Sequence, residues 1–416
     1  MQMTSSGPIA YISQFYPHLT ETFVYREVLA LRRRGLKVLT FGTWSPDRTK
    51  LSAEALPLVD ETVYVFPLVW RRYLGNHLCY LFRRPRRYLS TLCFVLTRRR
   101  QSWRNRGFSF LHFCMAVHLA RPMQRRGVSH IHAHFAINAA TIALVISRLL
   151  DVPFSFTAHN LLFTKQMILL EKCREARFIV AISEYTRRFL IDYAKPYDVA
   201  PKIHVVHCGL SPAEFSSPSD LPRKDLPEIL FVAQLQERKG APVLVEACGI
   251  LARRGVRFRC VIVGDGPERA RVEEAVRRHS LEEVVSLEGA VPQERVRAYF
   301  DHADLFVLPC VTAQSGDVDG VPVSLMEAMA KKIAVVSTRV SGIPELVEHG
   351  ESGLLVEEGE PGPLADAISR LLADDALRRR MGEAGRRKVE AEFDVEASAC
   401  RLSDLFRQSL RSAAGR

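Results

Sequence analysis

One acidic residue, Glu327, stands in a segment that is otherwise apolar and has the composition of a helix. From Val323 to Ala330 its neighbours are valine, leucine, methionine, alanine and a single serine. Such a helix has little polar surface, and an ionised carboxylate is seldom buried without a partner. Glu327 is therefore predicted to contact either a ligand or, as the alternative, a cation in a structural salt bridge.

The turn before this segment contains Asp319, Gly320, Val321 and Pro322. Proline favours the first helical positions, where backbone N–H groups lack partners inside the helix and the positive end of the helix dipole lies. A helix start of this kind can bind a phosphate or a sugar hydroxyl. The sequence thus predicts a ligand site at this helix start.

The spacing of Asp319 and Glu327 resembles the E-x7-E motif of the retaining glycosyltransferases of family four, with Asp319 in place of the usual first glutamate. Further segments resemble the same family in the same order: Phe231–Leu235 continuing to Lys239-Gly240, Val263–Pro267, Gly342–Glu345 and Gly350–Leu355. The resemblance implies the GT-B fold, two Rossmann-like doubly wound parallel-sheet domains that face each other across a cleft. The loop at 14–22 and the helix start at 25–28 look like the bacterial exopolysaccharide, colanic-acid-type branch.

Sugar transfer from a nucleotide sugar leaves negative charge on a diphosphate, which fixed cations and helix starts can stabilise. By resemblance, Lys239 binds that diphosphate with Arg238 beside it, Asp319 lies beside the transferred sugar, and Glu327 accepts hydrogen bonds from the ribose. Gln234 stands where the family usually has arginine. The full set of predicted donor-binding residues is Gln234, Arg238, Lys239, Gly264, Gly266, Val291, Gly320, Val321, Pro322 and Val323. As the alternative, the turn with Gly264 and Gly266 and the loop with Val291 are simply tight strand-to-helix connections.

In the first half of the chain, His159 follows an apolar strand where the family has a histidine that approaches the donor sugar. His159, Asp319 and Glu327 are the predicted catalytic residues, and Asn160 replaces the common aspartate. His130, His132 and His134 fall on one face of a strand, a spacing that could present a metal site. With no carboxylate or cysteine close by in the sequence to complete the set, and since the family works without a bound metal, no metal and no cofactor are predicted beyond a UDP- or GDP-linked co-substrate.

Positive charge is concentrated in one segment. Between Thr62 and Leu150 there is no Asp, Glu or Lys but 15 arginines, whereas the whole chain of 416 residues has a net charge of +12. Aromatic residues among the arginines suit an anionic lipid surface, and no run is apolar enough to span a membrane. A solvated helix face and a nucleic-acid surface are the alternatives, although no nucleic-acid-binding motif is present. The predicted membrane-facing residues are Arg83, Arg84, Arg86, Arg87, Arg98, Arg99 and Arg100.

Strand and helix patterns alternate along the chain, as expected for parallel sheets with crossover helices. Among them, 61–66, 154–158 and 305–308 are predicted as strands, 293–302 as a helix, and 362–392 as a charged helical stretch. The predicted organisation is an acceptor-side domain at 1–208 with the basic segment at 67–126, a nucleotide-sugar domain at 209–392, and a helix at 393–416 that packs back on the first domain. Nine cysteines without a paired pattern indicate reduced thiols, and the N-terminus lacks the order of a signal peptide.

These patterns predict a cytoplasmic, metal-independent, retaining glycosyltransferase on the inner face of the plasma membrane. It would transfer a sugar to a lipid-linked or polysaccharide acceptor and bind no nucleic acid. The departures at Gln234, Asp319 and Asn160 keep a second class open, a catalytically weak or inactive binding or scaffold protein of the same fold.

Overall fold

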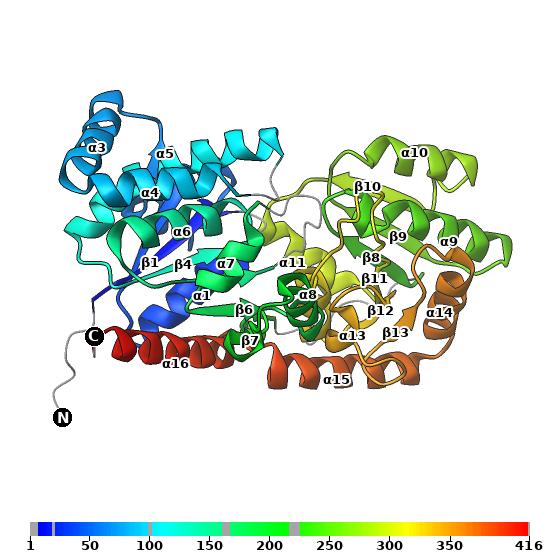
Figure 1. Cartoon of the computed structure of the whole chain (residues 1–416). Helices are drawn as coiled ribbons and strands as arrows, with labels where there is room; N and C mark the ends of the chain where they lie inside the picture. The colour runs from blue at the N-terminus through cyan, green and yellow to red at the C-terminus, as the bar shows by residue number, and fades with distance from the viewer. Residues whose placement is uncertain (1–6, 19–20, 99–101, 160–166, 216–224, 415–416) are drawn as a thin grey trace. The chain divides into compact units, whose positions relative to one another are not determined.

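The computed structural model describes residues 7–18, 21–98, 102–159, 167–215 and 225–414. The chain divides into two compact units. The first contains residues 1–207 together with 395–416, and the second contains residues 208–394. Each unit is built around its own parallel sheet, and the alternating helices and strands can be followed in Figure 1.

The first unit has a seven-stranded sheet in the order β3-β2-β1-β4-β5-β6-β7. Every neighbouring pair of strands is parallel. The chain starts in the middle of the sheet, builds outward to β3, and returns to the other side of β1, so the strand order reverses between β1 and β4. The strands are β1 (Ile9–Phe15), β2 (Val38–Trp44), β3 (Val63–Phe66), β4 (His130–His134), β5 (Phe154–Ala158), β6 (Phe178–Ala181) and β7 (Ile203–Val205).

Helices cover both faces of this sheet, and each face has its own apolar core. Successive residues of β1 alternate between the cores: Ala10 and Ile12 pack on the α5 and α6 side, and Ile9 and Tyr11 on the α1 and α16 side. Figure 1 shows α16 running beneath the sheet beside α1. The helices are α1 (Thr22–Arg33), α2 (Leu56–Glu61), α3 (Trp70–Arg83), α4 (Pro85–Leu96), α5 (Trp103–Arg125), α6 (Asn138–Leu150), α7 (Leu169–Glu175), α8 (Glu184–Ala194) and α16 (Val395–Ala414).

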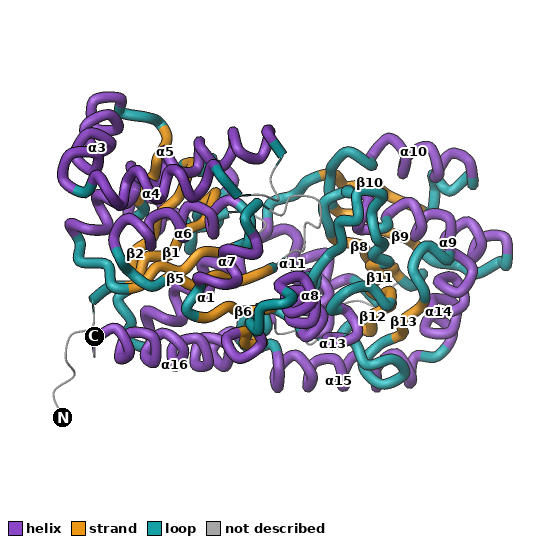
Figure 2. Tube along the Cα trace, in the orientation of Figure 1, coloured by secondary structure: helices purple, strands orange, loops and turns teal. Residues whose placement is uncertain are grey.

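The second unit has a six-stranded parallel sheet in the order β10-β9-β8-β11-β12-β13, with the reversal between β8 and β11. Figure 2 shows its strands enclosed by helices. The strands are β8 (Glu228–Val232), β9 (Arg259–Val263), β10 (Val285–Gly289), β11 (Leu305–Leu308), β12 (Ala334–Thr338) and β13 (Leu354–Val356). The helices are α9 (Ala241–Arg253), α10 (Arg269–Arg278), α11 (Gln293–His302), α12 (Val323–Ala330), α13 (Ile343–Leu346), α14 (Pro361–Ala373) and α15 (Asp375–Glu392).

The sequence-based prediction of a doubly wound α/β fold with two parallel sheets is confirmed, and its errors are local. Glu61 ends helix α2 instead of opening strand β3. The charged stretch from 362 to 392, predicted as one helical region, is two helices, because Asp374 caps a new helix by accepting a hydrogen bond from the Leu377 N–H. Pro322 is the residue before α12 rather than its first helical residue.

The basic segment forms the three helices α3, α4 and α5, which pack on one another, and α4 and α5 also pack on α6. Several large apolar side chains on them are exposed, with Phe82 at 77% and Trp103 at 84%. On α3 the exposed residues Trp70, Leu74, Leu78 and Phe82 recur every four positions and so share one helix face. Within the described residues, none of the helices combines the length and the apolar character that crossing a membrane would require.

Candidate functional site

The predicted donor-binding residues of the second unit gather where its strand order reverses. The loop after β8 carries Arg238 and Lys239, and the loop after β11 carries Asp319. Because β8 and β11 are neighbours, their carboxyl ends bring these loops together. In open α/β sheets this is the place where ligands bind.

Three ion-pair contacts join the loops, and two of them are also hydrogen bonds. The Lys239 ammonium binds the Asp319 carboxylate, and Arg238 Nη1 donates to Asp317 Oδ2 at 2.8 Å. Arg238 Nε lies 3.8 Å from Asp319 Oδ1, too far for a hydrogen bond. The four side chains are largely buried, with exposed fractions between 10% and 21%. Arg238 Nε and Asp317 Oδ1 have no hydrogen-bond partner among the described residues.

The apolar helix expected around Glu327 is present as α12, but the burial differs from the prediction. Glu327 is half-buried, whereas Asp319 is buried with 7% exposure. Gly320, Val321 and Pro322 are buried as well, and Val323 and Ser324, the first helical residues, are half-buried. Asp319 is thus the enclosed carboxylate of this motif, and the helix start lies next to it in the chain.

Close backbone contact explains the glycines of the neighbouring turns. A Cβ atom at Gly240 would lie 1.8 Å from the Pro309 carbonyl oxygen, and one at Gly264 would lie 1.8 Å from that of Ala233. At Gly266 it would meet the Leu235 oxygen at 2.5 Å. Gly264 and Gly266 let the turn after β9 pack against the turn after β8, and Gly240 lets the turn after β8, which carries Lys239, pack against the segment after β11.

Two other predicted donor-binding residues lie at the same edge of the sheet. Gln234 follows β8, is exposed, and accepts a hydrogen bond from Gln236 Nε2 at 3.0 Å. Its amide supplies no positive charge at the position where the family has arginine. Val291 follows β10 and is half-buried.

In the first unit, His159 directly follows β5 and belongs to a chain of hydrogen bonds. Its Nε2 lies 2.8 Å from His134 Nδ1, and His134 Nε2 lies 3.1 Å from Glu27 Oε1. The Tyr11 hydroxyl donates to the same Glu27 oxygen at 2.8 Å. The His159 ring also packs against Phe23 and Phe135, each with its centroid 4.7 Å away. Burial, and then the neighbouring His134, hold the pKa of His159 well below the usual histidine value.

The three histidines of β4 differ in their hydrogen-bond partners. His130 Nε2 and His132 Nδ1 both lie 2.7 Å from the Ser155 hydroxyl, and His132 Nε2 lies 3.0 Å from Thr157 Oγ1. A carboxylate does lie near two of these histidines, although it is distant in the sequence. One oxygen of Glu27 lies within 4.8 Å of a ring nitrogen of His132 and of a ring nitrogen of His134. Hydroxyl groups of β5 already pair both nitrogens of His132.

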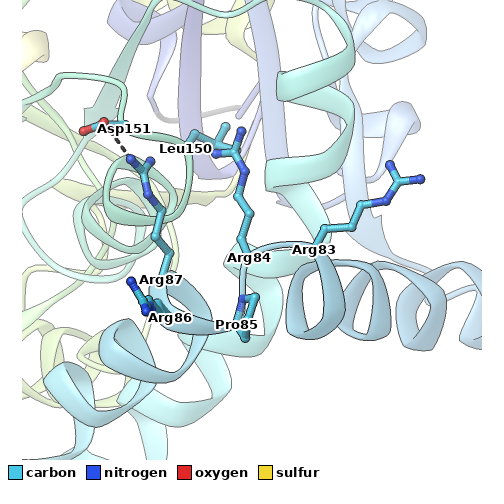
Figure 3. A pocket seen from close by; sticks show the side chains of 7 residues that line it. All are labelled: Arg83, Arg84, Pro85, Arg86, Arg87, Leu150 and Asp151. Atoms are coloured by element: carbon cyan, nitrogen blue, oxygen red, sulfur yellow. Dashed lines mark hydrogen bonds and ion pairs between the residues drawn. The ribbon is translucent and has the colours of Figure 1, made fainter.

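Four of the seven predicted membrane-facing arginines lie at the corner between α3 and α4. Figure 3 shows Arg83, Arg84, Arg86 and Arg87 around a shallow pocket completed by Leu150 and Asp151. Arg84 donates to the Leu149 carbonyl oxygen at 3.2 Å, and Arg87 donates to Asp151 at 2.8 Å. Arg83, Arg86 and Arg87 are exposed.

Arg98, farther along, stacks over the Phe94 ring at 4.3 Å. Arg99, Arg100 and Asn160 lie outside the described residues.

Sequence reasoning missed the two acidic residues that complete these clusters. Asp317 contacts Arg238, and the only signal for it was its position two residues before Asp319. Glu27 was noted as part of the helix start at 25–28 but not as a partner of His134, because that contact joins α1 to β4 across 107 residues.

Comparison with known proteins agrees with this architecture. Residues 20–214 match the model of Glycosyltransferase Family 4, and residues 213–388 match that of Glycosyl transferases group 1. Both models, one in each half of the chain, describe glycosyltransferases. Sucrose-phosphate synthase from Thermosynechococcus elongatus superposes with a TM-score of 0.76 at 21% identity, covering 98% of this chain and 100% of that one. HepE of Anabaena, solved with UDP and glucose, gives 0.72 at 17% identity, covering 97% and 100%. The fold is GT-B.

Among curated proteins, the amylovoran biosynthesis glycosyltransferase AmsK of Erwinia amylovora is 42% identical over 208 residues, which is 50% of this chain and 51% of that protein. The putative colanic acid biosynthesis glycosyltransferase WcaL of Escherichia coli K12 is 43% identical over 209 residues, 49% of this chain and 51% of that protein. The chain thus spans about half the length of the curated relatives it matches. The predicted resemblance to exopolysaccharide glycosyltransferases is confirmed.

Proposed function

We propose that this chain is a retaining glycosyltransferase of exopolysaccharide synthesis, which transfers a sugar from a UDP- or GDP-linked donor to a lipid-linked or polysaccharide acceptor. The observation that carries the proposal is the pairing of Lys239 and Arg238 with Asp319 and Asp317 at the strand reversal of the second unit. Two cations and two carboxylates in one largely buried place suit a ligand that has both a diphosphate and hydroxyl groups.

The donor diphosphate binds to Lys239 and Arg238, whose charges stabilise the leaving group as the glycosidic bond breaks. No metal ion or cofactor is needed for that role in this proposal. The Asp319 carboxylate, displaced from Lys239 by the diphosphate, then accepts hydrogen bonds from the sugar hydroxyls, and Glu327 does so from the ribose. Arg238 Nε and Asp317 Oδ1, which make no hydrogen bond to the described residues, supply one further donor and one further acceptor.

The acceptor reaches the enzyme at a membrane in this proposal. The arginine-rich corner of α3 and α4 and the exposed aromatic residues of α3 and α5 support contact with anionic lipid. All nine cysteines are free thiols, which suits a protein of the reducing cytoplasm on the inner face of the plasma membrane.

A panel of UDP- and GDP-linked sugars tested by thermal unfolding would identify the donor, because a ligand at about 100 times its Kd stabilises the native state by about 2.7 kcal/mol. Transfer and hydrolysis of that donor are then compared for wild type and Glu327→Ala. A large loss of activity is expected in the variant, and equal activity would reject an enzyme acting at this site.

The second candidate function is a binding or scaffold protein that has lost turnover. The uncharged, exposed Gln234, at the position where the family usually has arginine, favours it. It predicts thermal stabilisation by a nucleotide sugar together with neither transfer nor hydrolysis, a combination that the same two measurements would detect.

A further inference from the structure

We propose that Tyr11, Glu27 and His134 form a positioning relay that holds His159 in one tautomer, with the proton on Nε2 and a lone pair on Nδ1. The relay lies wholly within the first unit, at the strand reversal between β1 and β4. Its effect is to make His159 a hydrogen-bond acceptor through Nδ1. That His159 then accepts a hydrogen bond from a hydroxyl group of the donor sugar rests on the proposed function.

The direction of the relay follows from the groups at its far end. Burial, followed by the charge of Glu27, raises the pKa of Tyr11 well above its usual value, so the phenol keeps its proton and donates to Glu27. A carboxylate can only accept hydrogen bonds. The proton between Glu27 Oε1 and His134 Nε2 therefore sits on the nitrogen.

Once His134 carries its proton on Nε2, its Nδ1 is the acceptor of a neutral imidazole. The His159 Nε2 that lies 2.8 Å from this nitrogen must then be the donor, and the remaining nitrogen of His159, Nδ1, carries the lone pair. This is the logic by which a carboxylate fixes the tautomer of a histidine in catalytic and metal sites.

Packing holds the relay rigid. His134 is fully buried and His159 is 3% exposed. The two rings are stacked at a centroid separation of 5.1 Å, and Tyr11 packs against His134 at 5.4 Å. A proton on the wrong nitrogen would place two N–H groups, or two lone pairs, face to face inside the core, where a polar group left without a hydrogen-bond partner is destabilising. One tautomer should therefore dominate.

The relay can be tested without any knowledge of the substrate, by nitrogen-15 NMR of the full chain labelled at histidine. In wild type at neutral pH, we expect protons on His159 Nε2 and His134 Nε2, none on either Nδ1, and a nitrogen–nitrogen coupling across the bond between the rings. A proton on His159 Nδ1, or protons on both nitrogens of His134, would overturn the proposal. This measurement uses the wild-type protein, so its outcome does not depend on the folding of a variant.

Glu27→Leu removes the carboxylate that fixes the direction. We expect the His159 Nε2 proton to exchange with water at least about tenfold faster, and the coupling to be lost. The matched control is Ser155→Ala, which removes hydrogen bonds of His130 and His132 in the same buried row but none in the relay. Unchanged exchange in Glu27→Leu, or an equal change in both variants, would contradict the relay.

A metal site is the alternative to the relay. Stoichiometric Zn²⁺ uptake by wild type that displaces the Nε2 proton of His134 would overturn the relay in favour of that site.

A third measurement separates this proposal from the proposed function. GDP-mannose and UDP-glucose are titrated into the labelled protein while the His159 Nδ1 signal is followed. A fixed tautomer with an Nδ1 shift on addition of either sugar nucleotide supports both proposals. A fixed tautomer with no response rejects contact between His159 and these donors and leaves the relay standing.

Discussion

Lys239 and Asp319 form a largely buried ion pair between the loops that follow β8 and β11, 80 residues apart in the chain. The pair brings together the cation and the carboxylate that the resemblance assigned to two different parts of the donor, its diphosphate and its sugar. With Asp317 pairing Arg238 beside it, the site balances its own charges before any ligand is bound.

The first prediction concerns the coupling between these two residues. Lys239→Met leaves the Asp319 carboxylate enclosed without its main partner, and Asp319→Asn does the same to the ammonium. Breaking a buried pair from one side costs about 3 kcal/mol. Each single variant should therefore lose about that much free energy of unfolding, and the double variant should lose much less than the sum. Chemical denaturation of the four proteins measures the coupling, and additive losses would show that the pair contributes nothing of its own.

A second prediction addresses the short side chain of Asp319. Asp319→Glu adds one methylene to a side chain that is 7% exposed, so the carboxylate reaches farther toward the bound sugar. We expect the ratio of kcat/KM values for two competing nucleotide sugars to change by about tenfold, the effect of about 1.4 kcal/mol in differential transition-state binding. Asp317→Glu is the matched control in the same loop. A ratio that stays constant in Asp319→Glu would remove Asp319 from donor selection.

The third prediction tests the arginine corner. Replacing Arg83, Arg84, Arg86 and Arg87 with glutamine should weaken binding to phosphatidylserine-containing vesicles by at least about tenfold, because each basic residue near an anionic surface contributes about 1 kcal/mol. The binding of wild type should fall with added salt. Co-sedimentation with vesicles gives the partition directly.

The control for this experiment removes an equal charge elsewhere. Arg277, Arg379, Arg380 and Arg387 are exposed residues of the second unit, and their replacement with glutamine should leave vesicle binding close to wild type. Equal weakening by both sets would indicate a net-charge effect without a site. Tighter retention on DNA than on the vesicles would favour a nucleic-acid surface.

Local patterns predicted the fold because each element carries its own signal. Strand β11 is a run of four apolar residues, β5 alternates apolar residues with Ser155 and Thr157, and α11 was predicted with its observed bounds. The gathering of site residues at the carboxyl ends of parallel strands follows from the same alternation. The sequence and the resemblance were therefore enough to expect Lys239 and Asp319 at the same edge of the sheet, where the structure has them in contact.

The contacts that these residues make could not be predicted from the sequence, for a physical reason. The contact of Lys239 with Asp319 requires β11 to pair with β8, although β9 and β10 intervene in the chain. The contact of Glu27 with His134 requires α1 to lie over the end of β4. Neither arrangement can be recognised from the local spacing of residues. The burial of a side chain depends on the tertiary arrangement as well, and for this reason the sequence did not predict that Asp319, rather than Glu327, is the buried carboxylate.

The last prediction uses a buried lysine outside the proposed donor site. Lys172 in α7 has no exposed surface, and its ammonium donates to the carbonyl oxygens of Ala136 and Ile137 at 2.6 and 2.9 Å. Burial lowers its pKa from 10.5 to about 7. Above pH 7 the unfolded chain therefore binds a proton that the native protein lacks, so the native state gains stability as pH rises toward 10, by about 1.4 kcal/mol per pH unit.

Lys172→Met cannot titrate and should lack this slope. The difference in unfolding free energy between wild type and Lys172→Met should consequently shift in favour of wild type from pH 7 to pH 10 and stay constant below pH 6, where lysine is protonated in both states. Urea denaturation across this range measures it, with Lys37→Met as the control because Lys37 is exposed. Parallel pH profiles for wild type and Lys172→Met would mean that Lys172 keeps its proton in the native protein, held by the two carbonyl oxygens that it contacts.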